Sequence, residues 1–319
     1  MGLFPKKHVA KGVMAGIVPG ARGIAAAQIR HQPGRAPVLD FCDYAQLPGE
    51  RDMTQAFSRL VKTRRLGRVP CNVTLGLGDY TLLLVESPDV PAGERRAAIR
   101  WRIRDLVDFD TEDAVIDVFE LPPHKGAEQS PMIYAVVARR ERIDQCAALF
   151  KQAGATLNAI DIPELVIRNV AALLPEDASG VAFLYLDEDT GLITLTRQDV
   201  LYLSRRIDTG QARIRELAPA GQLTEKLEGC LDGIIIEIQR SLDYYESHYA
   251  QPPASGLVIS PLQSPVAGLD DYLASQLGMS TRILDLNSLV DSSTPIPDEL
   301  QGPCLPALGA ALREVEAGA

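Results

Sequence analysis

The sequence predicts an α/β protein made of two similar lobes. Each half of the chain opens with apolar strands joined by a tight turn, at residues 16–30 and again at 181–207. Each half then alternates amphipathic helical segments with short apolar strands. Apolar residues spaced by three and four run from about 224 to 249 and predict one long helix. The repeated plan indicates a duplicated architecture.

Local patterns predict the elements of the first half. Residues 52–66 show helical spacing, and residues 73–86 alternate around the turn Gly78-Asp79, as in a hairpin. Residues 140–154 are predicted to form a helix that ends at a glycine, and residues 163–174 a helix that begins with a proline. Strands are expected at 114–121, 132–138 and 158–162. A helix is expected at 92–108, with its apolar stripe formed by Ile99, Ile103, Leu106 and Val107.

The elements expected in the second half complete the domain plan of the chain. It is expected to hold strands at 181–186, 192–196, 201–207, 256–259 and 282–286, and helices at 269–278 and 305–314. We predict a flexible basic arm at 1–12, a first lobe at 13–87 and 141–178, and a second lobe at 179–319, with residues 88–140 between the two parts of the first lobe. A cleft is expected between the two lobes.

Charge is distributed unevenly along the chain. The net charge of −10 argues against a nucleic acid as the main partner, yet residues 1–70 hold 12 lysines and arginines against 4 acidic residues. A cationic group there comprises Arg59, Lys62, Arg64, Arg65 and Arg68. It is either a surface that faces anionic lipid or an ordinary solvated helix end. No apolar run is long enough to span a bilayer, so we expect a cytoplasmic protein.

Cysteine and histidine spacing does not indicate a metal site. The five cysteines, at 42, 71, 146, 230 and 304, include no C-x-x-C pair, and the four histidines lie far apart in sequence. We therefore expect reduced, buried thiols and no bound metal. Neither a Walker loop nor a G-x-S-x-G motif occurs, so no catalytic residue is predicted.

The first strand pair carries an altered nucleotide loop. Its sequence GIVPGARG, at 16–23, resembles in cadence the first phosphate loop of actin-like and Hsp70-like ATPases. Those loops carry an acidic residue for the metal and small polar residues for phosphate. Here the acidic position reads Val18, and Pro19 has no backbone donor.

Four further segments resemble the PilM family of type IV pilus assembly proteins. They are AAIRWRIRDLVDF at 97–109, IDIPEL at 160–165, IEIQRSLDYY at 236–245 and LPALGAALR at 305–313. The resemblance covers about residues 12–315 and is greatest to the branch of the mannose-sensitive haemagglutinin (MSHA) pilus. It implies an actin-like fold of duplicated, ribonuclease H-like lobes, with residues 88–140 as an inserted α+β subdomain in place of the actin one.

The resemblance also implies a partner. A PilM-like protein would form a cytoplasmic ring or platform beneath the inner membrane and hold the cytoplasmic N-terminal peptide of a membrane-spanning, PilN-like assembly protein. That peptide would lie between the insert and the first lobe. The sequence offers Trp101, Ala97 and Ala98, with Phe109 beyond, as an apolar anchor surface. Burial of Trp101 and Phe109 within the insert is the alternative.

The remaining nucleotide loops also depart from the family pattern. Where an acid-x-Gly triplet is usual, the chain has Tyr185-Leu186-Asp187, and where a glycine cluster is usual, it has Ser260-Pro261. In a shifted alignment, Asp187 or Asp189 would be a metal ligand; a solvated turn is favoured. The vestigial nucleotide loops thus comprise Gly16, Gly20, Asp187, Asp189 and Ser260.

We therefore expect a non-catalytic scaffold of pilus assembly without a cofactor, ATP and Mg²⁺ included. Two alternatives stay open: an active actin-like ATPase with unusual loops, and a cytoplasmic L-type component of a type II secretion system, which shares the fold.

Overall fold

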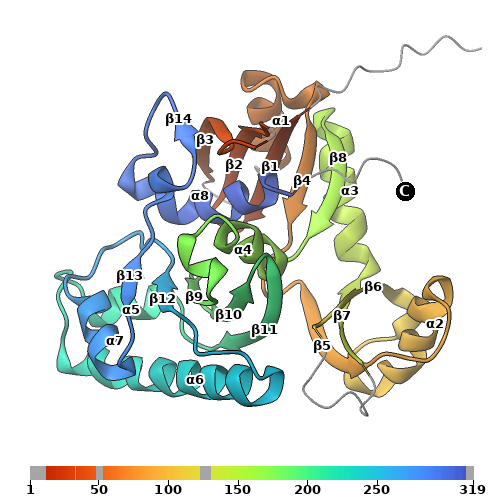
Figure 1. Cartoon of the computed structure of the whole chain (residues 1–319). Coiled ribbons are helices and arrows are strands. Elements are labelled where there is room, and N and C mark those ends of the chain that lie inside the picture. The colour runs from red at the N-terminus through yellow and green to blue at the C-terminus, as the bar shows by residue number, and fades with distance from the viewer. Residues whose placement is uncertain (1–11, 33, 48–52, 123–130, 314–319) are drawn as a thin grey trace, which may run out of the picture. The chain divides into compact units, whose positions relative to one another are not determined.

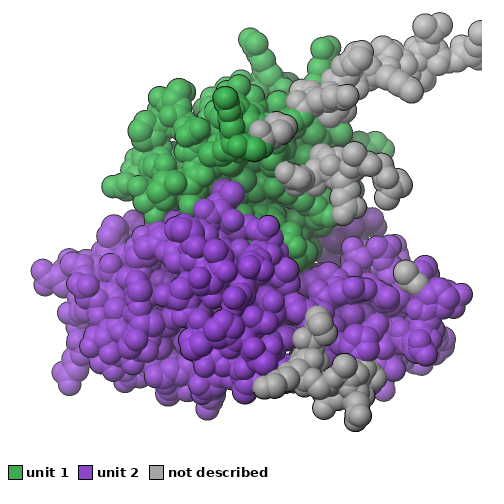
Figure 2. Space-filling view, in the orientation of Figure 1, with its two compact units in different colours: residues 1–75, 146–170, 285–319 green, residues 76–145, 171–284 purple. Residues whose placement is uncertain are grey.

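The described part of the chain is organised on three β-sheets (Figure 1). The computed structural model describes residues 12–32, 34–47, 53–122 and 131–313, so the predicted arm at 1–12 lies almost wholly outside the described residues. The chain divides into two units (Figure 2). Unit 1 comprises residues 1–75, 146–170 and 285–319, and unit 2 comprises residues 76–145 and 171–284.

Unit 1 is built on a six-stranded sheet in the order β14-β3-β2-β1-β4-β8. Its strands are β1 (Val13–Gly20), β2 (Gly23–Arg30), β3 (Val38–Gln46), β4 (Pro70–Thr74), β8 (Thr156–Asp161) and β14 (Asp291–Ser292). β1, β2 and β3 pair antiparallel, while β4 and β8 continue the sheet in parallel. The unit also holds α1 (Met53–Thr63) and α8 (Asp298–Ala311), and most of α4 (Pro163–Ala171).

Helix α8 forms the centre of the unit 1 core. It packs on β1, β2 and β3, and its residues from Gln301 to Ala311 are almost all buried. A helix that is apolar on every side is expected in a core rather than on a surface. The predicted second lobe at 179–319 is therefore wrong at its end, because residues 285–313 return to the first sheet through α8 and through β14, which pairs with β3.

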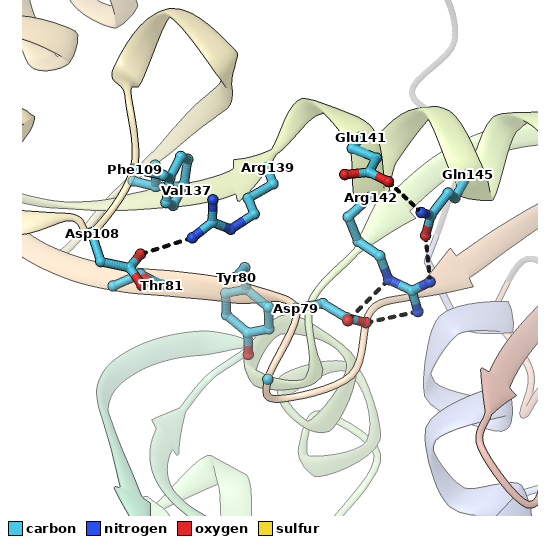
Figure 3. A pocket seen from close by; sticks show the side chains of 11 residues that line it. Asp79, Tyr80, Thr81, Asp108, Phe109, Val137, Arg139, Glu141, Arg142 and Gln145 are labelled. Carbon is cyan, nitrogen blue, oxygen red and sulfur yellow. Dashed lines mark hydrogen bonds and ion pairs between the residues drawn. The ribbon is translucent and has the colours of Figure 1, made fainter.

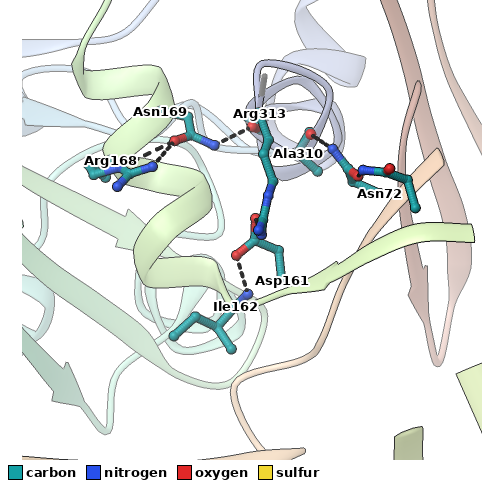
Figure 4. Close-up of polar contacts among 9 residues, drawn as sticks. Asn72, Asp161, Ile162, Arg168, Asn169, Ala310 and Arg313 are labelled. Atoms are coloured by element: carbon teal, nitrogen blue, oxygen red, sulfur yellow. Dashed lines mark hydrogen bonds and ion pairs between the residues drawn. The ribbon is translucent and has the colours of Figure 1, made fainter. Parts of the chain in front are cut away.

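Asparagine side chains satisfy the last turn of α8 (Figure 4). Asn72 donates to the Ala310 carbonyl at 2.9 Å, and Asn169 donates to the Gly309 carbonyl at 3.0 Å. Asn158 in turn donates to the Asn72 side-chain oxygen at 2.8 Å. The last carbonyls of a helix have no partner within it, so these amides stabilise the helix end inside the core.

One pair of cysteines differs from the expectation. Cys42 of β3 and Cys304 of α8 form a disulfide with a Cα–Cα distance of 6.3 Å, so the expectation of reduced thiols throughout is wrong for this pair. The two residues are 262 positions apart, and their sequence spacing gave no sign of the contact. Cys71 and Cys146 are buried and belong to no disulfide, as expected, and burial raises the pKa of the Cys71 thiol to about 12.

The larger sheet of unit 2 has the order β11-β10-β9-β12-β13. Its strands are β9 (Val181–Leu186), β10 (Gly191–Arg197), β11 (Val200–Ile207), β12 (Gly256–Ile259) and β13 (Thr281–Ile283); its helices are α5 (Gln211–Leu217), α6 (Glu225–Tyr249) and α7 (Leu269–Leu277). The Thr224 hydroxyl caps α6 by accepting from the Leu227 N–H at 3.1 Å. The predicted long helix is confirmed: its apolar stripe, including Leu231, Ile234 and Ile238, packs against the sheet.

The smaller sheet of unit 2 is the inserted subdomain, with the order β5-β7-β6. Its strands are β5 (Tyr80–Glu86), β6 (Ala114–Glu120) and β7 (Met132–Arg139), and α2 (Ala92–Arg102) covers one face through Ile99 and Ile103. The next helix, α3 (Arg140–Ala153), begins directly after β7. Because β5 belongs to this sheet, the insert begins near residue 80 and not at 88 as predicted.

Helix α2 ends earlier than predicted. The last α-helical bond runs from the Ile103 N–H to the Ile99 carbonyl, and a short 3-10 turn over Arg104–Leu106 follows. The tighter turn changes the angular step, so Leu106 leaves the predicted stripe and is 56% exposed. Val107 is half-buried beside the insert core, as its place in the stripe predicted.

Candidate functional site: a pocket at the base of the insert

A cavity of about 400 Å³ lies within unit 2, where the insert sheet meets the start of α3 (Figure 3). Its wall is formed by the turn before β5, the segment after the 3-10 turn, the end of β7 and the first turns of α3. The lining residues are Gly78, Asp79, Tyr80, Thr81, Asp108, Phe109, Val137, Arg139, Glu141, Arg142 and Gln145.

Arg139 lines one side of the pocket. It stands at the end of β7, with its guanidinium carbon 4.2 Å from the centroid of the Phe109 ring, and it pairs with Asp108 at 3.2 Å. A guanidinium over an aromatic face is a favourable cation–π contact. Phe109 is half-buried, so the ring and the cation together present a flat surface that is open on one side.

A second ion pair fixes the opposite side. The Arg142 guanidinium contacts both carboxylate oxygens of Asp79 at 2.9 Å, and that carboxylate also accepts the Gly76 N–H at 2.8 Å. The turn before β5 is thus joined to the start of α3 by a two-point contact, which holds more firmly than a single ion pair. On α3 itself, Gln145 donates to Glu141 at 3.2 Å.

The pocket combines aromatic and charged groups. It holds two aromatic rings, two arginines and three carboxylates. Such a mixture of aromatic and charged groups resembles a protein-recognition surface, where arginine and aromatic residues carry most of the affinity.

The structure divides the predicted anchor residues between two places. Phe109 lines the pocket, whereas Trp101 does not: its side chain is 75% exposed on the outer side of α2, and burial of Trp101 in the insert core is therefore wrong. Ala97 is exposed and Ala98 is half-buried on the same helix. Sequence reasoning missed Asp79, Arg139 and Arg142; their signal was charge at strand and helix ends around the predicted Gly78-Asp79 turn.

The predicted cationic group lies at the end of α1 and in the turn after it. Arg59, Lys62, Arg64, Arg65 and Arg68 are all exposed. Arg64 is engaged by the protein itself, because it pairs with Asp43 of β3 and lies 4.8 Å from the centroid of the Phe41 ring. The exposed cations at this helix end also complement its negative dipole.

The first vestigial loop is a tight hairpin inside unit 1. Val18 pairs with Ala25 in the β1–β2 ladder, and Gly20 pairs with Gly23, which leaves two residues in the turn. Gly16 is not in the loop: it lies in the middle of β1, where a Cβ atom would come 1.9 Å from the Ala307 carbonyl of α8. The glycine that looked like part of a phosphate loop is thus required for helix packing.

The other vestigial loops, in unit 2, use their donors internally. The N–H groups of Gln211 and Ala212, at the start of α5, donate to the carbonyls of Asp187 and Glu188 at 2.7 and 2.8 Å. The buried Ser260 hydroxyl accepts the Leu186 N–H at 3.0 Å. Phosphate needs such backbone donors pointing into open space. Asp189 lies in the same β9–β10 turn.

Comparisons with known proteins identify the fold. No family model matches the sequence, and no curated protein matches it. Among solved structures, a PilM–PilN type IV pilus biogenesis complex matches with a TM-score of 0.72 and 19% identity, over 94% of this chain and 97% of that chain. The chain has an actin-like fold.

A second solved structure has a similar fold. The cytoplasmic domain of EpsL, an inner membrane component of the type II secretion system of Vibrio cholerae, matches with a TM-score of 0.50 and 11% identity, over 95% of this chain and 96% of that domain. The structural similarity to PilM and to EpsL confirms the predicted actin-like fold of pilus and secretion proteins.

The described residues lack two further features. None of the helices in this part of the chain is long and apolar enough to cross a membrane. Within the same residues, no group of three or more His, Cys, Asp or Glu side chains is arranged to hold a metal ion.

Proposed function

We propose that this chain is a PilM-like scaffold of type IV pilus assembly that binds the cytoplasmic N-terminal peptide of a PilN-like inner-membrane protein. The observation that carries the proposal is the match to a PilM–PilN complex over nearly the whole of both chains. The pocket at the base of the insert supports it, because Phe109 and Arg139 offer a flat aromatic and cationic surface to an extended peptide. The sequence segments quoted above favour the MSHA pilus, and hence an MshI-type protein.

The experiment is a binding titration with a fluorescein-labelled synthetic peptide of the cytoplasmic N-terminal segment of the PilN-like protein from the same organism. We expect Phe109→Ala to weaken binding by about 2 kcal/mol, since a half-buried ring lines the pocket. If the peptide also covers α2, Trp101→Ala weakens binding by a similar amount without changing the melting temperature, because Trp101 is exposed.

Controls separate binding from folding. Leu106→Ala removes an exposed apolar side chain outside the pocket and should change neither affinity nor melting temperature. If the Phe109→Ala variant has a far lower melting temperature but binds the peptide normally when folded, the peptide binds elsewhere on the protein. Failure of the peptide to bind at all would refute the proposed function.

We further propose that the protein lacks a nucleotide cofactor and ATPase activity. The support is chemical: the ladder position of Val18, the internal hydrogen bonds at the start of α5 and the buried Ser260 leave no set of donors and anionic ligands for Mg-phosphate. Calorimetry with Mg-ATP is expected to show no saturable heat and no rise in melting temperature. A dissociation constant below about 10 µM, worth roughly 7 kcal/mol, would favour the active ATPase instead.

We propose a place at the inner face of the inner membrane, reached through the partner and assisted by the cations of α1. Exposed Arg59, Lys62, Arg65 and Arg68 support a weak electrostatic contact with anionic lipid. Sedimentation with anionic vesicles should then decrease as salt rises. Binding that is equal on neutral vesicles would remove this electrostatic role. From the resemblance to PilM we also propose that the protein self-associates into a ring.

A further inference from the structure

The two edges of the insert sheet are treated differently by the protein. β7 is the central strand, and β6 and β5 are the edges. On β6, the Ala114 carbonyl accepts from Arg140 at 3.2 Å, and the Asp117 carboxylate accepts the Val118 N–H at 3.0 Å. Asp117 also pairs with Arg96 of α2 at 2.7 Å. Charged side chains that occupy an edge are a usual protection against pairing with another chain.

The edge of β5 is open at its centre. The Ser87 N–H donates to the Pro131 carbonyl at 2.7 Å, in register with the antiparallel β5–β7 ladder. Hydrogen-bonded pairs alternate in such a ladder, so the odd residues of β5 face β7 and the even ones face outward. The outward Tyr80 and Glu86 carbonyls accept from Arg206 at 3.3 Å and Arg102 at 2.9 Å.

Between those two arginines lie Leu82 and Leu84. Among the described residues, none donates to or accepts from their outward backbone groups. β5 carries no charged residue before Glu86, no proline and no bulge in its register, so it has none of the usual protections. Leu84 is 43% exposed, on the same face as its ladder partner Tyr134.

Arg206 adds a charge to one end of this edge. Its guanidinium donates to the Tyr80 carbonyl and lies 4.8 Å from the centroid of the Tyr80 ring. No carboxylate of a described residue forms an ion pair with it. The edge thus presents, in order, an available cation, two open backbone positions and an exposed leucine.

We propose that the open edge of β5 receives an extended segment of a partner protein as an additional strand, with apolar side chains against Leu82 and Leu84 and a carboxylate paired with Arg206. Backbone hydrogen bonds supply the affinity of such strand addition, and alternate side chains supply its specificity. Tyr80 borders both this edge and the pocket of Phe109, but Leu82 and Leu84 do not line that pocket, and the proposal does not depend on the pilus function.

The test uses two synthetic peptides with the probe sequence Thr-Val-Thr-Val-Thr, one with glutamate at its N-terminus and one with glutamate at its C-terminus. Each is titrated into the full chain labelled with 15N. The expected result is saturable shift changes at the amides of Leu82 and Leu84, with slowed hydrogen exchange at both, for one peptide orientation. Shift changes confined to the lining of the pocket, or none at millimolar concentration for either peptide, would overturn the proposal.

Methylated peptides test the strand geometry without altering the protein. Only every second amide of an added strand faces β5, so N-methylation of one alternate set should weaken binding at least about tenfold, and methylation of the other set should not. Equal affinity of the two methylated peptides would contradict strand addition.

Variants of the protein provide the matched measurement. Leu84→Pro removes an outward N–H but no bond to β7, so it should abolish peptide binding at nearly unchanged melting temperature. Replacing the glutamate of the peptide by glutamine should weaken its binding to the natural chain several-fold. The same replacement should not weaken its binding to the Arg206→Gln variant. Unchanged binding to folded Leu84→Pro, or equal glutamine effects on both chains, would refute the assigned contacts.

Discussion

Replacement of Gly16 by alanine is expected to lower the free energy of unfolding by about 3 kcal/mol. Gly16 lies in the middle of β1, and an added Cβ would come 1.9 Å from the Ala307 carbonyl and 2.6 Å from the Ala311 nitrogen. Both atoms belong to the backbone of α8, so no side-chain rotation relieves the overlap. Either the helix or the strand must shift, and the core between them loses its packing. Urea unfolding, followed by circular dichroism, measures the effect.

The same substitution elsewhere provides the control. Gly233 lies inside α6, where an added Cβ meets no atom within 4 Å. Gly233→Ala should therefore raise the free energy of unfolding, by up to about 1 kcal/mol, because alanine favours the helix. Opposite signs for the two variants are the expected outcome. A neutral surface substitution changes the free energy of unfolding by less than about 0.5 kcal/mol. A loss that small in Gly16→Ala would show that α8 does not sit against β1 as described.

Gly16 also shows what the sequence alone conveys. The spacing of Gly16 and Gly20 predicted a strand and a turn, and both are present. It could not separate a phosphate loop from close packing, because glycine serves both where a backbone must approach another group. The distinction needed α8, which comes almost 300 residues later in the chain.

Elements with a clear local period were predictable, and contacts between distant elements were not. The stripe of α6 specified both its type and its length, from Glu225 to Tyr249. By contrast, α8 is apolar all round, so its sequence indicated burial without indicating the sheet that covers it. The pairing of Cys42 with Cys304 was hidden for the same reason.

The candidate site was predictable only in part. Phe109 was selected as an aromatic at the end of a charged helix, and it lines the pocket. Its neighbour Arg139 comes from a strand 30 residues later, and Asp79 from a turn before the insert. Only the antiparallel register of β5 and β7 brings these segments together, and one sequence does not define that register.

Replacement of Arg313 by alanine is expected to lower the free energy of unfolding by about 2 kcal/mol. Its guanidinium donates at 3.0 Å to the carboxylate of Asp161, which is only 3% exposed at the end of β8 (Figure 4). From the described residues, the other carboxylate oxygen accepts the Ile162 N–H alone, at 3.0 Å. Without Arg313, a buried negative charge loses its counter-charge, although water reaching the vacated position of the half-exposed arginine limits the effect.

A double-mutant cycle identifies the cause. Asp161→Asn in the Arg313→Ala background removes the buried charge, so the pair of changes should destabilise less than Arg313→Ala alone. Arg313→Lys keeps the charge but loses the planar donor, and is expected to fall between the natural chain and the alanine variant. Urea unfolding at pH 7 is measured for the natural chain, Arg313→Ala, Asp161→Asn, the double variant and Arg313→Lys. Additive losses from the two single changes would mean that Asp161 and Arg313 are not coupled, and that α8 and the asparagine contacts fix this end of the core without the ion pair.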